Sequence, residues 1–174
     1  NATLVGNRIE DNTAFNGAGL YVQGAAPLLQ GNRLANNRAT NAGGGLVLTQ
    51  SSHATLQRNV IESNSSVSDG GGAVVQNGSN ALVQWNVLRN NTAANNGTSG
   101  GVKFYGSGSP TFDSNWLEGN EAKDGGGAYL ELGNSVLFAN NVLRSNRARS
   151  YGGGLVANGV SATIRNNLII NNQA

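Results

Sequence analysis

The segment NVIESN, residues 59–64, decides the fold, because its pattern Asn-x-[Ile/Leu]-x-x-Asn recurs along almost the whole chain. Its seven copies begin at Asn7, Asn32, Asn59, Asn86, Asn115, Asn141 and Asn167. Successive copies lie 25 to 29 residues apart. This period is typical of stacked repeats that each add one layer to a continuous core. The spacing therefore predicts a solenoid.

A second motif, a glycine turn followed by a short apolar strand, recurs with the same spacing, as in GGGLVL at 43–48 and GGGAVV at 70–75. The glycines that close this turn are Gly19, Gly45, Gly72, Gly101, Gly127 and Gly154. Another apolar residue stands three positions before each motif asparagine, as Leu56 does before Asn59. Each repeat thus predicts three short strands separated by turns.

Three short strands per repeat favour a parallel β-coil, in which equivalent strands stack about 4.8 Å apart. Leucine-rich repeats are the main rival, but their leucines at fixed offsets are missing. We predict an all-β parallel β-helix of six to seven coils of roughly 26 residues with three short strands each, as one domain over residues 1–174.

Strand alternation predicts which side chains form the core. In the glycine-led strands we expect Leu20 and Val22, and their equivalents in later coils, to point inward. The equivalent inward residues are Leu46, Leu48, Ala73, Val75, Val102, Phe104, Ala128 and Leu130. The residues between them are expected to face solvent.

The motif asparagines predict two structural ladders, in which each side-chain amide bonds its equivalent one coil away. The first ladder consists of the seven asparagines that begin the motif. The second consists of Asn12, Asn37, Asn64, Asn91, Asn120, Asn146 and Asn172. We expect these asparagines to stand at strand-ending corners with unusual backbone angles, and the glycines to supply positive φ in tight turns.

Composition narrows the class of protein. Hydrophobic residues make up 38% of the chain and charged residues 11%, with a formal net charge of +2. Cysteine is absent, which excludes disulfides and thiol chemistry. No apolar run approaches the ~20 residues of a transmembrane helix, so we predict no membrane span.

The three-strand repeat with its asparagine ladder resembles the right-handed parallel β-helix of the pectate-lyase-like superfamily. The sequence GGA[Val/Tyr] at Gly71 and Gly126, and the [Ile/Leu]-x-x-Asn signals within the motif copies, also resemble the GGA[ILV] and FxxN repeats of polymorphic outer-membrane adhesins. Here leucine or isoleucine replaces the phenylalanine of that family. The resemblance implies a right-handed fold, and it implies an activity poorly.

Enzymes of this superfamily carry their chemistry on outward residues of stacked strands. The candidate patch here is Lys103, Tyr105, Tyr129 and Glu131, which the register places on one sheet face in adjacent coils. A lysine or tyrosine could serve as the base of a polysaccharide lyase, and the rings could stack on sugars. With Tyr21, these residues form the predicted ligand-binding set, and Lys103, Tyr129 and Glu131 are the weak catalytic candidates.

Other chemistries find little support. Asp69 and Asp124 precede glycine turns two coils apart and are interpreted as turn residues, and His53 has no second histidine beside it, so we expect no metal site and no cofactor. The basic cluster Arg144, Arg147, Arg149 and Arg165 lacks interleaved aromatic residues, so we expect no nucleic-acid partner.

One column of charges is attributed to stability. The position three after the first motif asparagine reads Glu62, Arg89, Glu118 and Arg144 in four successive coils. The alternation of sign at one inter-strand spacing predicts a surface salt ladder.

These observations favour a non-catalytic, extracellular or cell-surface β-helix that acts as a rigid structural, adhesin-like or filament-forming subunit. The chain opens and closes in repeat register, so we expect either a fragment of a longer protein or a subunit that stacks end to end on itself. The alternative is a polysaccharide lyase, or a carbohydrate-binding β-helix, that acts on acidic polysaccharide through the Lys/Tyr face.

Overall fold

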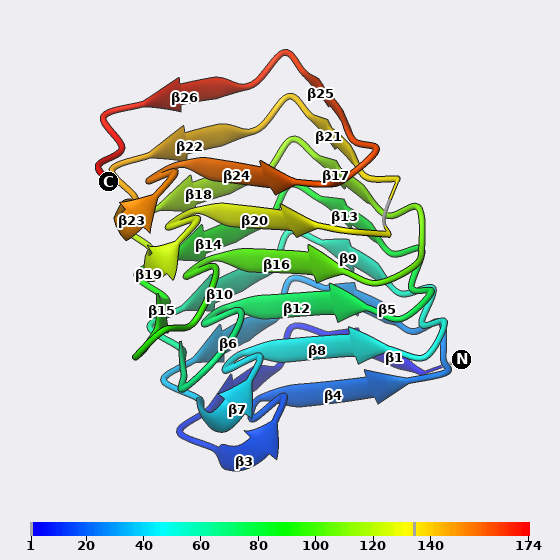
Figure 1. The fold of residues 1–174 in the computed structure, drawn as a ribbon. Coiled ribbons are helices and arrows are strands. Elements are labelled where there is room, and N and C mark those ends of the chain that lie inside the picture. The colour runs from blue at the N-terminus through cyan, green and yellow to red at the C-terminus, as the bar shows by residue number, and fades with distance from the viewer. Residues whose placement is uncertain (1, 134) are drawn as a thin grey trace.

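The chain winds into stacked coils of short parallel strands, and each strand pairs with its equivalent one coil away (Figure 1). The computed structural model describes residues 2–133 and 135–174. Within these residues there is no helix, and hence none long and apolar enough to cross a membrane. The predicted all-β parallel β-solenoid is confirmed.

Four parallel sheets run along the solenoid, and we name them the rear, motif, side and front sheets. The rear sheet precedes the first motif asparagine and contains β1 (Thr3–Val5), β5 (Leu28–Gln30), β9 (Thr55–Gln57), β13 (Leu82–Gln84), β17 (Thr111–Asp113), β21 (Leu137–Ala139) and β25 (Thr163–Arg165). The motif sheet lies within the repeated motif and contains β2 (Arg8–Glu10), β6 (Arg33–Ala35), β10 (Val60–Glu62), β14 (Val87–Arg89), β18 (Trp116–Glu118), β22 (Val142–Arg144) and β26 (Leu168–Ile170).

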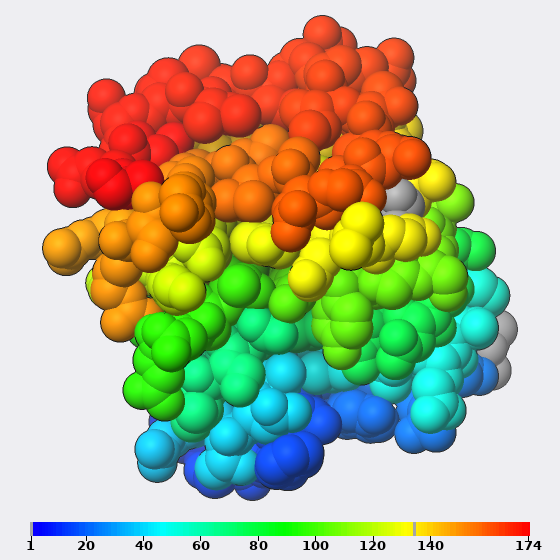
Figure 2. Space-filling model, viewed as in Figure 1, coloured from blue at the N-terminus to red at the C-terminus, as the bar shows by residue number. Residues whose placement is uncertain are grey.

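The other two sheets flank the glycine turn. The side sheet precedes the turn and contains β3 (Thr13–Asn16), β7 (Arg38–Ala42), β11 (Ser65–Ser66), β15 (Thr92–Ala93), β19 (Glu121–Asp124) and β23 (Arg147–Tyr151). The front sheet follows the turn and contains β4 (Leu20–Gln23), β8 (Leu46–Thr49), β12 (Ala73–Gln76), β16 (Val102–Tyr105), β20 (Ala128–Glu131) and β24 (Leu155–Asn158). Figure 2 shows the coils as successive layers from the N-terminus to the C-terminus.

Each full coil therefore holds four strands, and the prediction of three was wrong. The missed strand belongs to the side sheet. Its members are as short as two residues, and their inward side chain is small, as at Ala39, Ala93 and Ala122. Strands this short with alanine inside carry almost no alternation of hydrophobicity, so the sequence pattern does not reveal them.

The core is a continuous column of apolar side chains from all the coils. The predicted inward residues of the front sheet lie in it, with Leu46, Leu48 and Phe104 fully buried. Three phenylalanines pack against one another: Phe104 meets Phe112 edge to face with ring centroids 5.6 Å apart, and Phe112 stacks on Phe138 with centroids 5.1 Å apart. Such pairs add to the stabilisation by simple burial.

Both predicted asparagine ladders are present. Asn59 Nδ2 donates to Asn86 Oδ1 at 2.9 Å and to the Leu29 carbonyl at 2.9 Å, and the Asn59 backbone N–H donates to the same Asn86 oxygen. The second ladder repeats this arrangement from Asn64 to Asn91. Each buried amide is thus fully bonded, which removes the cost of placing polar groups inside the coil.

The left-handed backbone angles lie one residue before each ladder asparagine, and not on the asparagine as predicted. Arg58 and Trp85 precede the first ladder with φ of 55° and 56°, and Ser63 and Asn90 precede the second with φ of 54° and 55°. The backbone N–H and the side-chain amide of a ladder asparagine both bond one acceptor oxygen. The residue before it therefore makes the turn.

Glycine is required in the glycine turn for two separate reasons. Its first residue has positive φ, as at Gly43 (65°) and Gly70 (57°), in agreement with the prediction. Its third residue does not, and it is glycine because there is no room: a β carbon on Gly45 would lie 2.6 Å from the Gly72 carbonyl oxygen. Close stacking of the coils thus explains why the third residue of the turn is glycine, although its φ is not positive.

Candidate functional site

The outer face of the front sheet carries two rows of side chains that run from coil to coil. The first row consists of Tyr21, Val47, Val74, Lys103, Tyr129 and Val156. The second row consists of Gln23, Thr49, Gln76, Tyr105, Glu131 and Asn158. One row is thus largely apolar or aromatic and its neighbour is polar.

Lys103 is the centre of this face. Its ammonium lies 2.9 Å from Asp69 Oδ2 and 2.9 Å from Glu131 Oε2. The same nitrogen lies 5.0 Å from the ring centroid of Tyr105 and 5.5 Å from that of Tyr129, within the range of a cation–π contact. The structure therefore brings the four residues of the predicted patch together, whereas Tyr21 stands three coils away on β4.

Asp69 completes this group, although its position before a glycine suggested only a turn residue. Its Oδ1 accepts hydrogen bonds from the Thr98 backbone N–H at 3.0 Å and from the Thr98 hydroxyl at 2.8 Å, and its Oδ2 faces Lys103. Asp69 lies in the turn, as predicted, and its pairing with Lys103 was not predicted. The signal was available in the repeat register, since the turn before the glycines adjoins the first row of the front sheet.

The first row is less exposed than strand alternation predicts. Tyr21 is exposed, but Val47, Val74 and Lys103 are buried, so the expectation that these residues face solvent was wrong. The glycine corner explains the two valines, because Gly43 and Gly70 pack directly against their γ-methyl groups. The front sheet therefore forms the floor of a corner whose other wall is the side sheet.

The charges in this corner are mutually stabilised. Burial alone raises the pKa of Asp69, but the Lys103 ammonium and the Thr98 hydrogen bonds outweigh it and hold that pKa below its ordinary value. Burial alone lowers the pKa of Lys103, yet its bonds to Asp69 and Glu131 raise that pKa above the ordinary value. Lys103 is therefore a bound cation at neutral pH, in a state that cannot accept a proton.

The neighbouring phenol is equally unsuited to act as a base. Burial raises the pKa of Tyr105, and although Lys103 opposes this, the carboxylates of Asp69 and Glu131 add to it. A phenol that stays protonated can donate a hydrogen bond but cannot abstract a proton. At neutral pH the patch therefore presents a bound ammonium and a protonated phenol.

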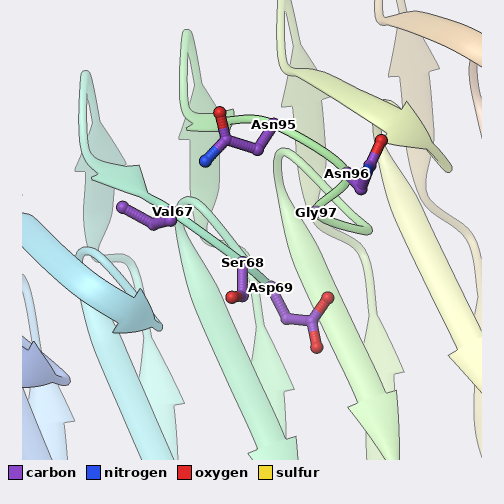
Figure 3. Close-up of a pocket in the computed structure, with 6 residues that line it drawn as sticks. All are labelled: Val67, Ser68, Asp69, Asn95, Asn96 and Gly97. Atoms are coloured by element: carbon purple, nitrogen blue, oxygen red, sulfur yellow. The ribbon is translucent and has the colours of Figure 1, made fainter.

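Two depressions lie beside this face. The first, of about 220 Å³, separates the loop of Val67, Ser68 and Asp69 from the loop of Asn95, Asn96 and Gly97. Figure 3 shows Asn95 and the Asp69 carboxylate at opposite ends of this group, and that carboxylate is already bonded to Thr98 and Lys103. The first depression therefore offers mainly amide and backbone groups.

The second depression, of about 380 Å³, lies in the corner between the side and front sheets, two coils further on. It is lined by Asp124, Tyr129, Tyr151, Val156, Ala157 and Asn158. Asn158 Nδ2 donates to the Tyr129 hydroxyl at 3.2 Å, and the Tyr151 backbone N–H donates to Asp124 Oδ1 at 3.2 Å. Two aromatic rings, a carboxylate and an amide thus converge there. Of these residues, only Tyr129 was predicted from the sequence to bind a ligand.

No group of three or more metal-ligating carboxylate, imidazole or thiol side chains converges anywhere in the described residues.

On the motif sheet, the predicted charge column forms two ion pairs, Arg89–Glu62 at 2.6 Å and Arg144–Glu118 at 2.9 Å. Arg33 enters it from a neighbouring row and bridges Glu62 and Glu10. The column is thus a branched network, in place of the simple ladder that was predicted.

The model of a protein family described as "Right handed beta helix region" matches residues 1–117 and 84–174, which together span the chain. The chain belongs to this family. The β-helix is thus right-handed, as its resemblance to the pectate-lyase-like superfamily implied. No curated protein and no solved structure matches this β-helix significantly.

Proposed function

We propose that this β-helix is a non-catalytic, extracellular or cell-surface protein that binds glycan through the outer face of the front sheet. The observation that carries the proposal is the state of Lys103, which is buried between two carboxylates and flanked by two tyrosine rings. The rings and the polar row beside them suit the two kinds of surface that a sugar presents, its apolar faces and its hydroxyl groups.

The same observation argues against a lyase. Elimination needs a base that is unprotonated at working pH, and both Lys103 and Tyr105 have a raised pKa. It also argues against an acidic polysaccharide as the ligand, because Asp69 and Glu131 together outweigh the single charge of Lys103. A neutral or cationic glycan suits this face better than a uronate polymer does.

Binding and turnover measured on the same glycans test the proposal. We expect the protein to bind a glycan on an array without forming product, and Tyr105→Ala and Tyr129→Ala to weaken binding about tenfold each. Trp116→Ala is the matched control, since Trp116 is an exposed aromatic on the motif sheet. An ultraviolet-absorbing unsaturated product that disappears in Lys103→Ala would establish the lyase instead.

A further inference from the structure

Two places along the corner between the side and front sheets have the same backbone geometry. At the first, Asp69 Oδ1 accepts from the backbone N–H of Thr98 in the next coil at 3.0 Å. At the second, Asp124 Oδ1 accepts from the backbone N–H of Tyr151 in the next coil at 3.2 Å. Thr98 pairs with Asp124, and Asp124 pairs with Tyr151, so the two carboxylates belong to one column.

The two places differ in the residue that the front sheet sets opposite the carboxylate. Opposite Asp69 stands Lys103, whose ammonium bonds Asp69 Oδ2 at 2.9 Å. Two coils on in the same row stands Val156, which brings no charge to Asp124. Within residues 2–133 and 135–174, no ion pair or hydrogen bond reaches Asp124 Oδ2. Asp69 is therefore paired with an ammonium, whereas, among the described residues, Asp124 has no cation at the equivalent place.

Space and aromatic surface accompany this unpaired oxygen. The depression of about 380 Å³ is lined by Val156 and by other residues of β19, β20, β23 and β24. Tyr129 lines it and also contacts Lys103, while Tyr151 is largely exposed at its rim. A cation here would lie between carboxylate and rings, as Lys103 does in its own coil.

We propose that this depression, the Asp124 pocket, binds the protonated amine of an amino sugar. The inference rests on the proposed glycan-binding function and names the sugar class. Lys103 in its own coil is the internal template: an ammonium held by an aspartate of the preceding coil and by tyrosine rings. Tyr129 and Asn158 stand beside the carboxylate and offer partners to sugar hydroxyls, which a lysine side chain from a partner protein would leave unused.

Calorimetric titration with three probes tests this inference: glucosamine oligomers, N-acetylglucosamine oligomers and oligolysine. We expect glucosamine oligomers to bind best, and Asp124→Asn to weaken them about ten- to hundredfold, because a charge-assisted hydrogen bond is lost. The asparagine oxygen can still accept from Tyr151, so the fold is retained. Asp11→Asn is the control, since Asp11 is an exposed carboxylate with φ of 59°, far from the front sheet, and asparagine tolerates that angle.

A second variant, Val156→Lys, rebuilds the Asp69–Lys103 pair inside the Asp124 pocket. We expect it to abolish binding of glucosamine oligomers while raising the melting temperature, because the internal ammonium takes the place of the ligand. Loss of binding together with loss of stability would count against the internal template.

The outcomes separate the inference from the function on which it rests. Equal binding of acetylated and free-amine oligomers would overturn recognition of the amine and leave the glycan-binding function standing. Binding of oligolysine alone would replace the sugar with a partner protein. Absence of binding to either sugar oligomer in the wild-type protein, with no other glycan bound on the array, would overturn both proposals.

Discussion

The interior and the outer face of this β-helix follow opposite rules. Inside, an asparagine occupies each ladder position in every coil, and the closing residue of every glycine turn is glycine. Outside, the first row of the front sheet changes from tyrosine to valine to lysine within four coils. Interior groups meet identical groups 4.8 Å or so away, so only a repeated residue satisfies them, whereas outer groups face solvent or one another.

Stability therefore depends more on the interior columns than on the outer face. A change in one interior column disturbs the coils above and below, because each group bonds both. A change on the outer face disturbs only the local contacts, which leaves that face free to carry a binding site.

Asn91→Ala should destabilise the protein most, by about 3–5 kcal/mol. Asn91 donates to Asn120 and to the Ile61 carbonyl and accepts two hydrogen bonds from Asn64, so its loss removes hydrogen bonds that join three coils and leaves buried groups of Ile61 and Asn64 without these partners. Chemical denaturation measures the free energy of unfolding. Asn90→Gly, at the exposed left-handed position next to it, should cost only a few tenths of a kcal/mol, and equal losses would contradict the contrast.

Gly72→Ala should cost about 2–4 kcal/mol, because the new β carbon would lie 2.6 Å from the Gly101 carbonyl oxygen and the coils would have to separate. The control is Gly31→Ala, where φ is +62° and nothing lies within 4 Å of the added carbon. Only backbone strain of about 1–2 kcal/mol is expected there. Thermal unfolding compares the two, and a larger loss for Gly31→Ala would show that backbone angle outweighs packing.

Lys103→Met should cost about 1–3 kcal/mol at neutral pH, because it leaves two carboxylates without their ammonium. The estimate is modest since the side chains of Asp69 and Glu131 keep 30% and 32% of their exposed surface and water screens them. Lys123→Met is the control, since Lys123 forms no ion pair within the described part of the chain. Equal losses in the two variants would show that the ion pairs contribute nothing specific.

The effect of Lys103→Met should also depend on pH. The folded pKa of Asp69 is lowered, so its contribution is present above the ordinary value of 3.8 and is lost as pH falls through the folded pKa. The folded pKa of Lys103 is raised, so its contribution is present below 10.5 and is lost as pH rises through the folded pKa. The difference between wild type and variant should be largest between about pH 5 and pH 9. A difference that does not change with pH would exclude the ion pair as its cause.

Glu62→Gln should have the smallest effect of the four, about 1–2 kcal/mol, and it should exceed that of Glu118→Gln. Glu62 binds both Arg33 and Arg89 with 10% of its side chain exposed, whereas Glu118 binds Arg144 alone among cations and is 33% exposed. The two arginines outweigh the effect of burial and lower the pKa of Glu62. Both losses should shrink in 1 M salt, and a salt-independent loss would indicate packing.

Much of the fold could be predicted from residue spacing. The solenoid, its two asparagine ladders and the inward residues of the front sheet follow from a motif that repeats every 25 to 29 residues. The side sheet could not be predicted, because strands such as Ser65–Ser66 are too short to show alternation. The positive φ at Trp85 could not be predicted either, because a bulky residue rarely adopts it and no local sequence pattern indicates it.

The candidate site could also be predicted only in part from the sequence. Register alone placed Lys103, Tyr105, Tyr129 and Glu131 in adjacent coils of one face. Burial of Lys103 and its bond to Asp69, 34 residues away, depend on the angle at which the side sheet meets the front sheet. That angle follows from the glycine corner, whose geometry arises only when neighbouring coils pack against it.

The sequence by itself determined the period, and with it the solenoid fold, the two asparagine ladders and the inward columns of the front sheet. It could do so because equivalent residues of neighbouring coils contact one another, so the same residue type recurs once in every repeat. Tertiary structure alone decided which outer charges pair and which carboxylate, that of Asp124, has an oxygen without a bonded partner among the described residues. Those pairings join different positions of different coils, as Asp69 and Lys103 do, whereas a repeat pattern relates only equivalent positions.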